Sequence, residues 1–328
     1  MASLPFVRVA LLVSFSVLLT VLLGFGLPAL LNAVAKCCGF PETSVTECIV
    51  GVYFIFVLYV ATPRIPRGSI EVKGKSVFIT GCDSGFGHAT AKHLHKLGFT
   101  VFAGCLFKDK GERGSKELEE MQSDRMKVVQ LDVCSEEQVN RAVESVGRGE
   151  QRRCVYVWRG GVYDHGDVPP GVRGRVVNLA SMYGRMGNAL RSPYCVSKYG
   201  VEAFSDCLRY EMKAWGVKVS VIEPGNFIVA TGILTRDIVA TTADKLWREA
   251  PPGVQEDYGH AHFDRHMAMM RSYCSSGQKD VQPVLDDITD AITSHRPFTR
   301  YNPMEPHWWI RMQVMTHLPA VIADRLYF

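Results

Sequence analysis

Residues 76–87 read SVFITGCDSGFG, a short apolar run that passes directly into a glycine-rich turn. Such a run, rich in β-branched residues, is typical of a buried strand. The next segment, HATAKHLHKLG (88–98), carries alanines and leucines at helical spacing and then a glycine that stops the helix. A strand, a glycine turn and a helix in this order predict an α/β fold, a Rossmann-like doubly wound parallel sheet.

The three glycines of the turn, Gly81, Gly85 and Gly87, indicate a binding site for a dinucleotide. They let the backbone turn tightly and approach a pyrophosphate closely. The following helix offers that anion unpaired N–H groups and the positive end of its dipole. A purely structural turn is the alternative, and the position between a strand and a helix disfavours it.

The end of the next predicted strand, TVFAGCL (100–106), bears on the choice of dinucleotide. At this point a ribose 2′-hydroxyl pairs with an acidic residue, whereas a 2′-phosphate pairs with an arginine. The tip begins with Cys105 and contains neither residue type, and Lys108 lies just beyond it. We therefore predict NAD as the cofactor.

A third strand is predicted at MKVVQLDV (126–133), with Asp132 at its end. This carboxylate either accepts a hydrogen bond from an adenine amino group or caps the helix that begins near Ser135.

The first seventy residues have a different composition from the rest. No charged residue lies between Arg8 and Lys36, and a bilayer is crossed by about 20 apolar residues. A second apolar run, 48–63, is of marginal length. We predict that residues 1–68 form a membrane anchor of one or two transmembrane segments with a linker, and that 69–328 form the catalytic domain. A buried helical hairpin and a cleaved secretory signal are the alternatives.

Charge and cysteine usage exclude several classes of function. A formal net charge of +4 without a long basic run argues against a nucleic-acid partner. The ten cysteines include no C-x-x-C pair, so neither a metal nor a disulfide framework is expected. Cys105 and Cys207 lie in apolar runs and are expected to be buried free thiols. The adjacent Cys37 and Cys38 alternatively indicate lipidation beside a membrane.

A second group of residues predicts acid–base chemistry. GRVVNLAS (174–181) is typical of a buried strand ending at Ser181, and Tyr194 and Lys198 follow at the head of a helix. Positions i and i+4 share a helical face, so the ammonium can lie beneath the phenol. A phenol is a poor base at neutral pH, but a nearby positive charge favours the phenolate, and a serine hydroxyl can hold the substrate oxygen.

TGCDSGFG, LDV, NLAS, YCVSK and EPGNF, in this order and spacing, resemble the short-chain dehydrogenase/reductase family over roughly residues 74 to 328. Longer stretches are similar to its membrane-associated, lipid-dependent, mitochondrial members that interconvert (R)-3-hydroxybutyrate and acetoacetate with NAD. The resemblance implies this reaction here, together with phosphatidylcholine as a lipid partner, a homo-oligomer and a place at the mitochondrial inner membrane or in the matrix. A membrane-bound hydroxysteroid or retinol dehydrogenase of the endoplasmic reticulum is the first alternative.

The resemblance also implies roles for single residues. Tyr194 would be the general acid/base, Ser181 would orient the carbonyl, and Lys198 would favour the phenolate and bind the nicotinamide ribose. A small hydroxy acid also needs a cation, and Arg191 would clamp its carboxylate, with a solvated loop arginine as the alternative. The implied cofactor site comprises Thr80, Gly81, Asp83, Ser84, Gly85, Phe86, Gly87, Cys105, Asp132, Tyr194, Lys198, Pro224, Gly225 and Thr231.

The middle of the chain departs from the family pattern. Only 48 residues separate Asp132 from Ser181, and no N-N-A-G segment occurs. We expect a truncated strand and helix region over about residues 133–173, with CVYVW (154–158) as a substitute strand and one sheet face lacking its helix. A non-catalytic nucleotide-binding or scaffold protein is therefore the second alternative. The tail, 305–328, is rich in Trp, Met and Leu and is expected to contact lipid, with plain core packing or a lid over the substrate pocket as the alternatives.

Overall fold

The chain divides into two compact units, Met1–Arg67 and Gly68–Phe328. A computed structural model describes residues 14–15, 17–18, 21–39, 51–53, 55, 67–147, 154–158 and 174–327. In the first unit, η1 (Leu22–Gly26), a π-helical segment, continues into α2 (Leu27–Cys37). Of the two predicted membrane segments, the first lies partly and the second almost wholly outside the described residues. None of the helices that are described is long and apolar enough to cross a bilayer.

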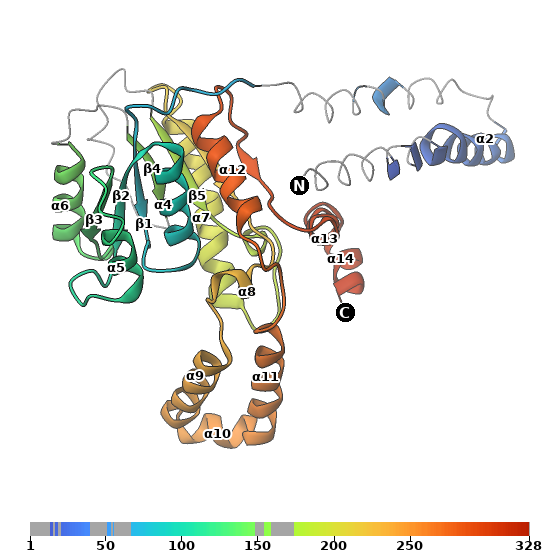
Figure 1. Cartoon of the computed structure of the whole chain (residues 1–328). Coiled ribbons are helices and arrows are strands. Elements are labelled where there is room, and N and C mark those ends of the chain that lie inside the picture. Colours follow the sequence, from blue (N-terminus) through green and yellow to red (C-terminus); the bar gives the residue numbers. More distant parts are fainter. Residues whose placement is uncertain are drawn as a thin grey trace. The chain divides into compact units, whose positions relative to one another are not determined.

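A seven-stranded parallel sheet forms the centre of the second unit (Figure 1). In chain order, its strands are β1 (Ser76–Thr80), β2 (Thr100–Cys105), β3 (Met126–Gln130), β4 (Cys154–Trp158), β5 (Arg175–Leu179), β6 (Lys218–Ile222) and β7 (Arg300–Tyr301). In space they follow the order β3-β2-β1-β4-β5-β6-β7. The winding reverses between β1 and β4, and ligands of such sheets bind at the carboxyl ends of the strands beside the reversal. The predicted Rossmann-like fold is confirmed.

Helices cover both faces of this sheet. The helices described in this unit are, in chain order, α4 (Gly85–Leu97), α5 (Arg113–Glu119), α6 (Glu136–Gly147), the 3-10 turn η4 (Met182–Gly184), α7 (Ser192–Glu211), α8 (Ile228–Thr231), α9 (Arg236–Glu249), α10 (Pro252–Tyr258), α11 (His260–Tyr273), α12 (Gln282–Thr293), α13 (Pro306–His317) and α14 (Ala320–Tyr327). The α4 and α12 helices share one core with the sheet, whereas α6 and α7 pack on its other face.

Alternation along β1 accounts for the two layers. Val77 and Ile79 join the core beneath α4 and α12, and Phe78 between them packs toward α6. All five residues of β1 are buried. A parallel strand covered on both faces is expected to be apolar throughout, which explains why SVFIT lacks a polar–apolar alternation.

The middle of the sheet is continuous despite the short connection. The β4 strand pairs in parallel with β1, with Cys154 opposite Ser76, and with β5, with Val155 opposite Arg175. The predicted substitute strand therefore forms. The interval 133–173 also retains α6. The helix expected to be missing would fall within 159–173, outside the described residues.

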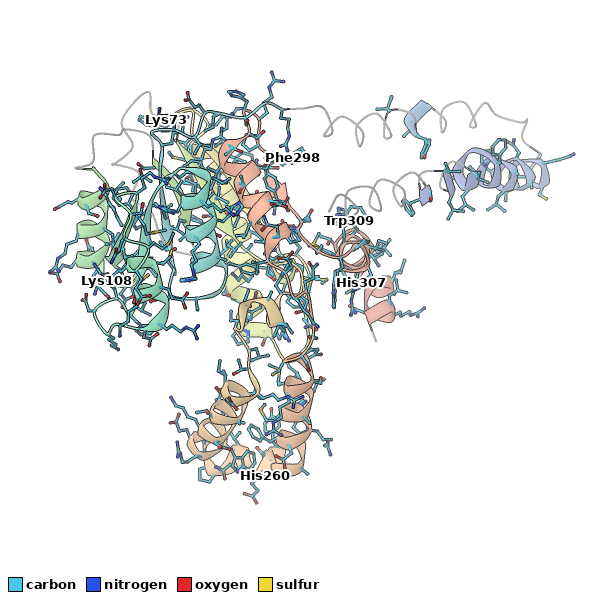
Figure 2. All side chains as sticks on the ribbon, viewed as in Figure 1. Lys73, Lys108, His260, Phe298, His307 and Trp309 are labelled. Atoms are coloured by element: carbon cyan, nitrogen blue, oxygen red, sulfur yellow. The ribbon has the colours of Figure 1, made fainter. Side chains whose placement is uncertain are left out.

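The α9, α10 and α11 helices project beyond the carboxyl edge of the sheet (Figure 1), and His260 lies near the far end of this projection (Figure 2). The α13 and α14 helices follow β7 and end the chain.

The eight cysteines whose side chains the structure describes are all free thiols. Cys105 is buried as predicted, and its burial, followed by the charges of Asp83 and Glu119, raises the pKa of its thiol to about 12. Cys207 is exposed, which corrects the expectation that it is buried. An apolar sequence neighbourhood was a poor guide there, because a helix turns only one of its faces to the core.

Candidate active site

One cavity of about 210 Å³ joins the glycine turn to the predicted serine, tyrosine and lysine. Its wall comes from the segments that follow β1, β5 and β6 and from α7, whose carboxyl-edge positions meet at one side of the sheet. Twelve of the predicted residues line it: Thr80, Ser84, Gly85, Phe86, Gly87, Ser181, Arg191, Tyr194, Lys198, Pro224, Gly225 and Thr231. The other four do not: Gly81, Asp83, Cys105 and Asp132.

The glycine turn brings the start of α4 very close to the end of β1. A Cβ atom on Gly87 would lie 2.2 Å from the carbonyl oxygen of Gly81, so only glycine fits there. Gly85 has a φ of +61°, in the left-handed region that favours glycine. The first turn of α4 contains no acidic residue, so the positive end of its dipole is available to an anion. These features fit the diphosphate of a dinucleotide.

Ser181 lies between the end of β5 and the loop after β6. It caps η4 by accepting a hydrogen bond from the Tyr183 N–H at 3.3 Å, and it is buried. The neighbouring Met182 N–H donates to the Pro224 carbonyl at 3.0 Å. The backbone beside the serine is therefore bonded to the loop after β6, and Ser181 itself lies in the cavity wall.

Lys198 connects β5 to the tyrosine one turn earlier on α7. Its ammonium donates to the Leu179 carbonyl at 3.0 Å and lies 5.8 Å from the centroid of the Tyr194 ring. The tyrosine is 42% exposed, and its ring meets that of Tyr183 edge-on at 6.4 Å. A phenol open to the cavity beside a fixed positive charge is suited to exchanging a proton with a bound alcohol.

Arg191, which immediately precedes α7, is stacked against two tyrosines. Its guanidinium carbon lies 5.6 Å from the centroid of Tyr183 and 4.8 Å from that of Tyr273, which ends α11. Among the described residues no carboxylate forms an ion pair with it. Cation–π contacts with two rings hold the guanidinium at the cavity, where its N–H groups can bind a planar anion.

The loop after β6 closes the far wall of the cavity. The Gly225 N–H donates to the Pro303 carbonyl at 3.1 Å, and a Cβ on this glycine would lie 2.6 Å from that of Met304. Thr231 lies beside the glycine turn, since a Cβ on Gly85 would be 3.7 Å from the threonine Cβ. The segment after β6 and the turn after β1 therefore meet at Thr231 and Gly85, and both line the cavity.

The four predicted residues outside the cavity wall have other contacts. Gly81 provides the carbonyl oxygen that lies close to Gly87 at the start of α4. The Asp83 carboxylate hydrogen-bonds the backbone at the tip of β2. Cys105 is fully buried. Asp132 accepts a hydrogen bond from the Cys134 N–H at 2.9 Å, in the turn before α6. The first turn of α6 is bonded by Ser135, whose hydroxyl accepts from the Gln138 N–H at 3.4 Å, so Asp132 does not make the helix-capping contact that was one of its two interpretations.

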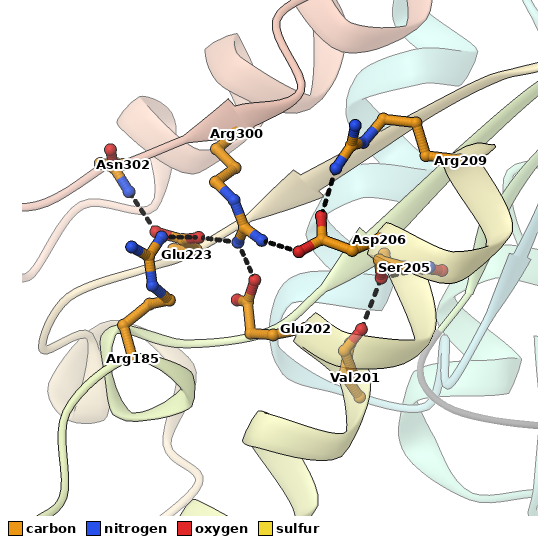
Figure 3. A network of polar contacts seen from close by, with 10 residues as sticks. Arg185, Val201, Glu202, Ser205, Asp206, Arg209, Glu223, Arg300 and Asn302 are labelled. Carbon is orange, nitrogen blue, oxygen red and sulfur yellow. Dashed lines mark hydrogen bonds and ion pairs between the residues drawn. The ribbon is translucent and has the colours of Figure 1, made fainter. Parts of the chain in front are cut away.

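An ionic cluster around Arg300, which includes two buried glutamates, was not predicted from the sequence (Figure 3). The Arg300 guanidinium, from β7, contacts Glu223 at 2.6 Å, Asp206 at 2.6 Å and Glu202. Glu223, which directly precedes the cavity-lining Pro224, is fully buried. Burial, and then the charge of Glu223, raise the pKa of Glu202 to about 7.

The available signal was the spacing along α7. Tyr194, Lys198, Glu202 and Asp206 recur every four residues and so share one face of the helix. Nothing in the sequence placed Arg300, almost a hundred residues further on, beside them.

Comparisons with known proteins agree with this geometry. A family model described as short chain dehydrogenase matches residues 75–152 and 168–237. The mitochondrial D-beta-hydroxybutyrate dehydrogenase of Rattus norvegicus is 47% identical over 287 residues, which are 77% of this chain and 84% of that protein. Retinol dehydrogenase 7 of Rattus norvegicus is 35% identical over 293 residues, which are 79% and 89%. A short chain dehydrogenase/reductase structure from Burkholderia phymatum, in complex with NAD, has a TM-score of 0.55 at 18% identity and covers 75% of this chain and 94% of that one.

Proposed function

Because the chain belongs to the short-chain dehydrogenase family and is an NAD-dependent oxidoreductase, we propose that it interconverts (R)-3-hydroxybutyrate and acetoacetate. The observation that carries the proposal is the presence of Arg191 in the same cavity as Ser181, Tyr194 and Lys198. The last three suit the oxidation of a secondary alcohol. A hydroxy acid adds a carboxylate, which a stacked guanidinium can bind through two parallel hydrogen bonds.

In the proposed mechanism Tyr194 moves the proton. Its phenolate takes the hydroxyl proton during oxidation, and its phenol returns that proton to the carbonyl oxygen during reduction. The Ser181 hydroxyl hydrogen-bonds the same substrate oxygen, and the Lys198 ammonium favours the phenolate. NAD, when bound, supplies the acceptor for the hydride that leaves the substrate carbon.

The residues that the family resemblance assigns to the cofactor in this part of the site all line the cavity wall. The turn from Ser84 to Gly87, at the positive end of α4, would hold the diphosphate. Lys198 would hold the nicotinamide ribose, and Pro224, Gly225 and Thr231 would border the nicotinamide.

The proposal is tested by following NADH formation from NAD and (R)-3-hydroxybutyrate with the full chain in phosphatidylcholine vesicles. We expect Tyr194→Phe to abolish turnover and Tyr210→Phe, an exposed tyrosine on the same helix, to leave it unchanged. We expect Arg191→Met to raise KM for the hydroxy acid at least tenfold with KM for NAD unchanged, because only the carboxylate contact is lost.

Two outcomes would contradict the proposal. If the protein oxidised a retinol or a hydroxysteroid but did not oxidise (R)-3-hydroxybutyrate, it would be a hydroxysteroid or retinol dehydrogenase. Full NADH binding without turnover of any substrate in the panel would favour a non-catalytic protein.

We also propose that the C-terminal helices contact phospholipid and that residues 1–68 anchor the protein to a membrane. Apolar side chains are exposed on α13 and α14 (Trp309 is labelled in Figure 2), namely Trp309, Ile310, Val321, Ile322 and Leu326. Such surfaces suit a bilayer interface. Residues 69–328, which lack the proposed anchor, test the C-terminal contact by co-sedimentation with phosphatidylcholine vesicles. Val321→Ser/Leu326→Ser should reduce the bound fraction and Leu246→Ser on α9 should not; equal losses in the two variants would rule the contact out.

A homo-oligomer and a mitochondrial location complete the proposal, and the names of the relatives support the location. Sedimentation analysis and a fluorescent fusion of the full chain would test the two statements separately. A monomer would contradict the first, and a reticular pattern, as for the endoplasmic reticulum, would contradict the second.

A further inference from the structure

The tip of β2 contains a carboxylate that the local sequence lacks. In Rossmann-like folds the residue that reads the ribose 2′ position lies at the end of the second strand. In this chain the strand ends at Cys105, and the next residues are apolar. The Asp83 side chain, from the glycine turn, occupies the place instead. Its two oxygens accept hydrogen bonds from the Leu106 N–H at 2.8 Å and the Phe107 N–H at 3.0 Å.

Asp83 is held in this position from its other side as well. The first turn of α5 lies directly against its backbone, because a Cβ on Gly114 would be only 1.7 Å from the Asp83 carbonyl oxygen. The backbone of Asp83 is thus packed against α5, while its carboxylate is bonded to the tip of β2. Each of its oxygens can still accept a further hydrogen bond, since a carboxylate oxygen has two lone pairs.

Of the basic residues that follow β2, Lys108 and Arg113 have partners elsewhere, whereas the Lys110 ammonium lies 5.1 Å from the centroid of the Phe107 ring. The Lys108 ammonium donates to the Val128 carbonyl at 2.8 Å and lies 3.8 Å from Glu119 (Lys108 is labelled in Figure 2). Arg113 pairs with Glu117 at 2.9 Å. A 2′-phosphate at this point would therefore meet an anion, and the two backbone N–H groups of the tip would already be occupied.

We propose that Asp83 sets the preference for NAD over NADP. Its carboxylate accepts a hydrogen bond from the ribose 2′-hydroxyl, and it excludes a 2′-phosphate by repulsion and by occupying the two tip amides. In other Rossmann-like folds an acidic residue at the end of the second strand binds the ribose. In this chain Asp83, from the glycine turn, takes its role. The inference concerns nucleotide binding alone and stands whichever alcohol the enzyme oxidises.

The test is a fluorescence titration of the full chain in phosphatidylcholine vesicles with NADH and with NADPH. We expect the ratio of the NADPH to the NADH dissociation constant to fall at least tenfold in Asp83→Asn, which keeps the size of the side chain and removes its charge. Asp109→Asn, which makes the same change on the loop after β2, should leave the ratio within twofold. Asp83→Glu, which keeps the charge, should retain most of the discrimination.

An unchanged ratio in Asp83→Asn, or an equal fall in Asp109→Asn, would overturn the proposal. If Asp83→Asn does not fold, the unsubstituted protein provides the test. Salt screens repulsion between exposed charges, so raising the ionic strength should narrow the gap between the two dissociation constants. A gap that widens with salt would mean that cations, and not Asp83, dominate this region.

Discussion

Replacing Glu202 by glutamine should change how the stability of the protein depends on pH. The side chain is almost fully buried on α7, between the Arg300 guanidinium and the Glu223 carboxylate. Burial first, and the charge of Glu223 second, disfavour its ionised form and raise its pKa from 4.5 to about 7. Glutamine has the shape of the protonated acid and never ionises.

The direction and size of the effect follow from linkage. The folded protein binds the Glu202 proton more tightly than the unfolded chain does. The stability that this proton contributes is therefore complete below pH 4.5 and is lost as the pH rises to about 7. Because one unit of pKa difference equals about 1.4 kcal/mol, the loss amounts to about 3 kcal/mol. The variant should match the unsubstituted protein near pH 4.5 and exceed its stability by up to that amount at pH 8.

Urea unfolding of both proteins between pH 4.5 and 8.5, in the same detergent, measures the difference. Taking the difference cancels the titration of His93 and His95, whose pKa values burial lowers. Glu256→Gln, on the exposed α10 helix, is the control: it also removes one carboxylate, but from the surface, and should not change how stability depends on pH. A difference between Glu202→Gln and the unsubstituted protein that stays constant across this range would refute the account of the cluster.

Three further predictions concern packing and reactivity. Gly114→Ala should weaken NADH binding at least tenfold in a fluorescence titration, because the new Cβ would collide with the backbone of the glycine turn, whereas Gly253→Ala, which has open space, should not. Arg300→Met should lower the free energy of unfolding by about 3–5 kcal/mol, since it leaves buried carboxylates uncompensated, whereas the exposed Arg248→Met should change it by less than about 0.5 kcal/mol. Labelling of the native protein at pH 8 should spare Cys105, whose pKa is about 12, and modify the exposed thiols; early labelling of Cys105 would contradict its burial.

The sequence was most informative where a local pattern has one physical solution. A β-branched run, a glycine turn and an amphipathic helix defined β1 and α4, and the spacing of Tyr194 and Lys198 placed both side chains on the cavity wall. The substitute strand was also found locally, because CVYVW has strand composition between two glycine-rich stretches.

Contacts between distant segments could not be predicted in the same way. Asp83 was assigned to the nucleotide only through the family resemblance, and its contact with the β2 tip depends on the folded path of two loops. Arg300 joins α7 and β6 from a strand of two residues that carries almost no sequence signal. Such contacts arise from tertiary geometry, which periodicity along the chain does not encode.

The position of β4 has a consequence for the cooperativity of the whole unit. In the described sheet it is the one strand that joins the ladder of β1, β2 and β3 to that of β5, β6 and β7, through five residues. The packing of α12 on α4 provides a second connection. A ligand in the cavity would touch residues after β1 and residues after β5 and β6, and so would form a third connection between the two groups of strands. Its binding energy would oppose their separation. The lifetime of the folded protein in the cell should therefore depend on nucleotide supply: a chain with such a short central connection is best protected from proteolysis while it is occupied.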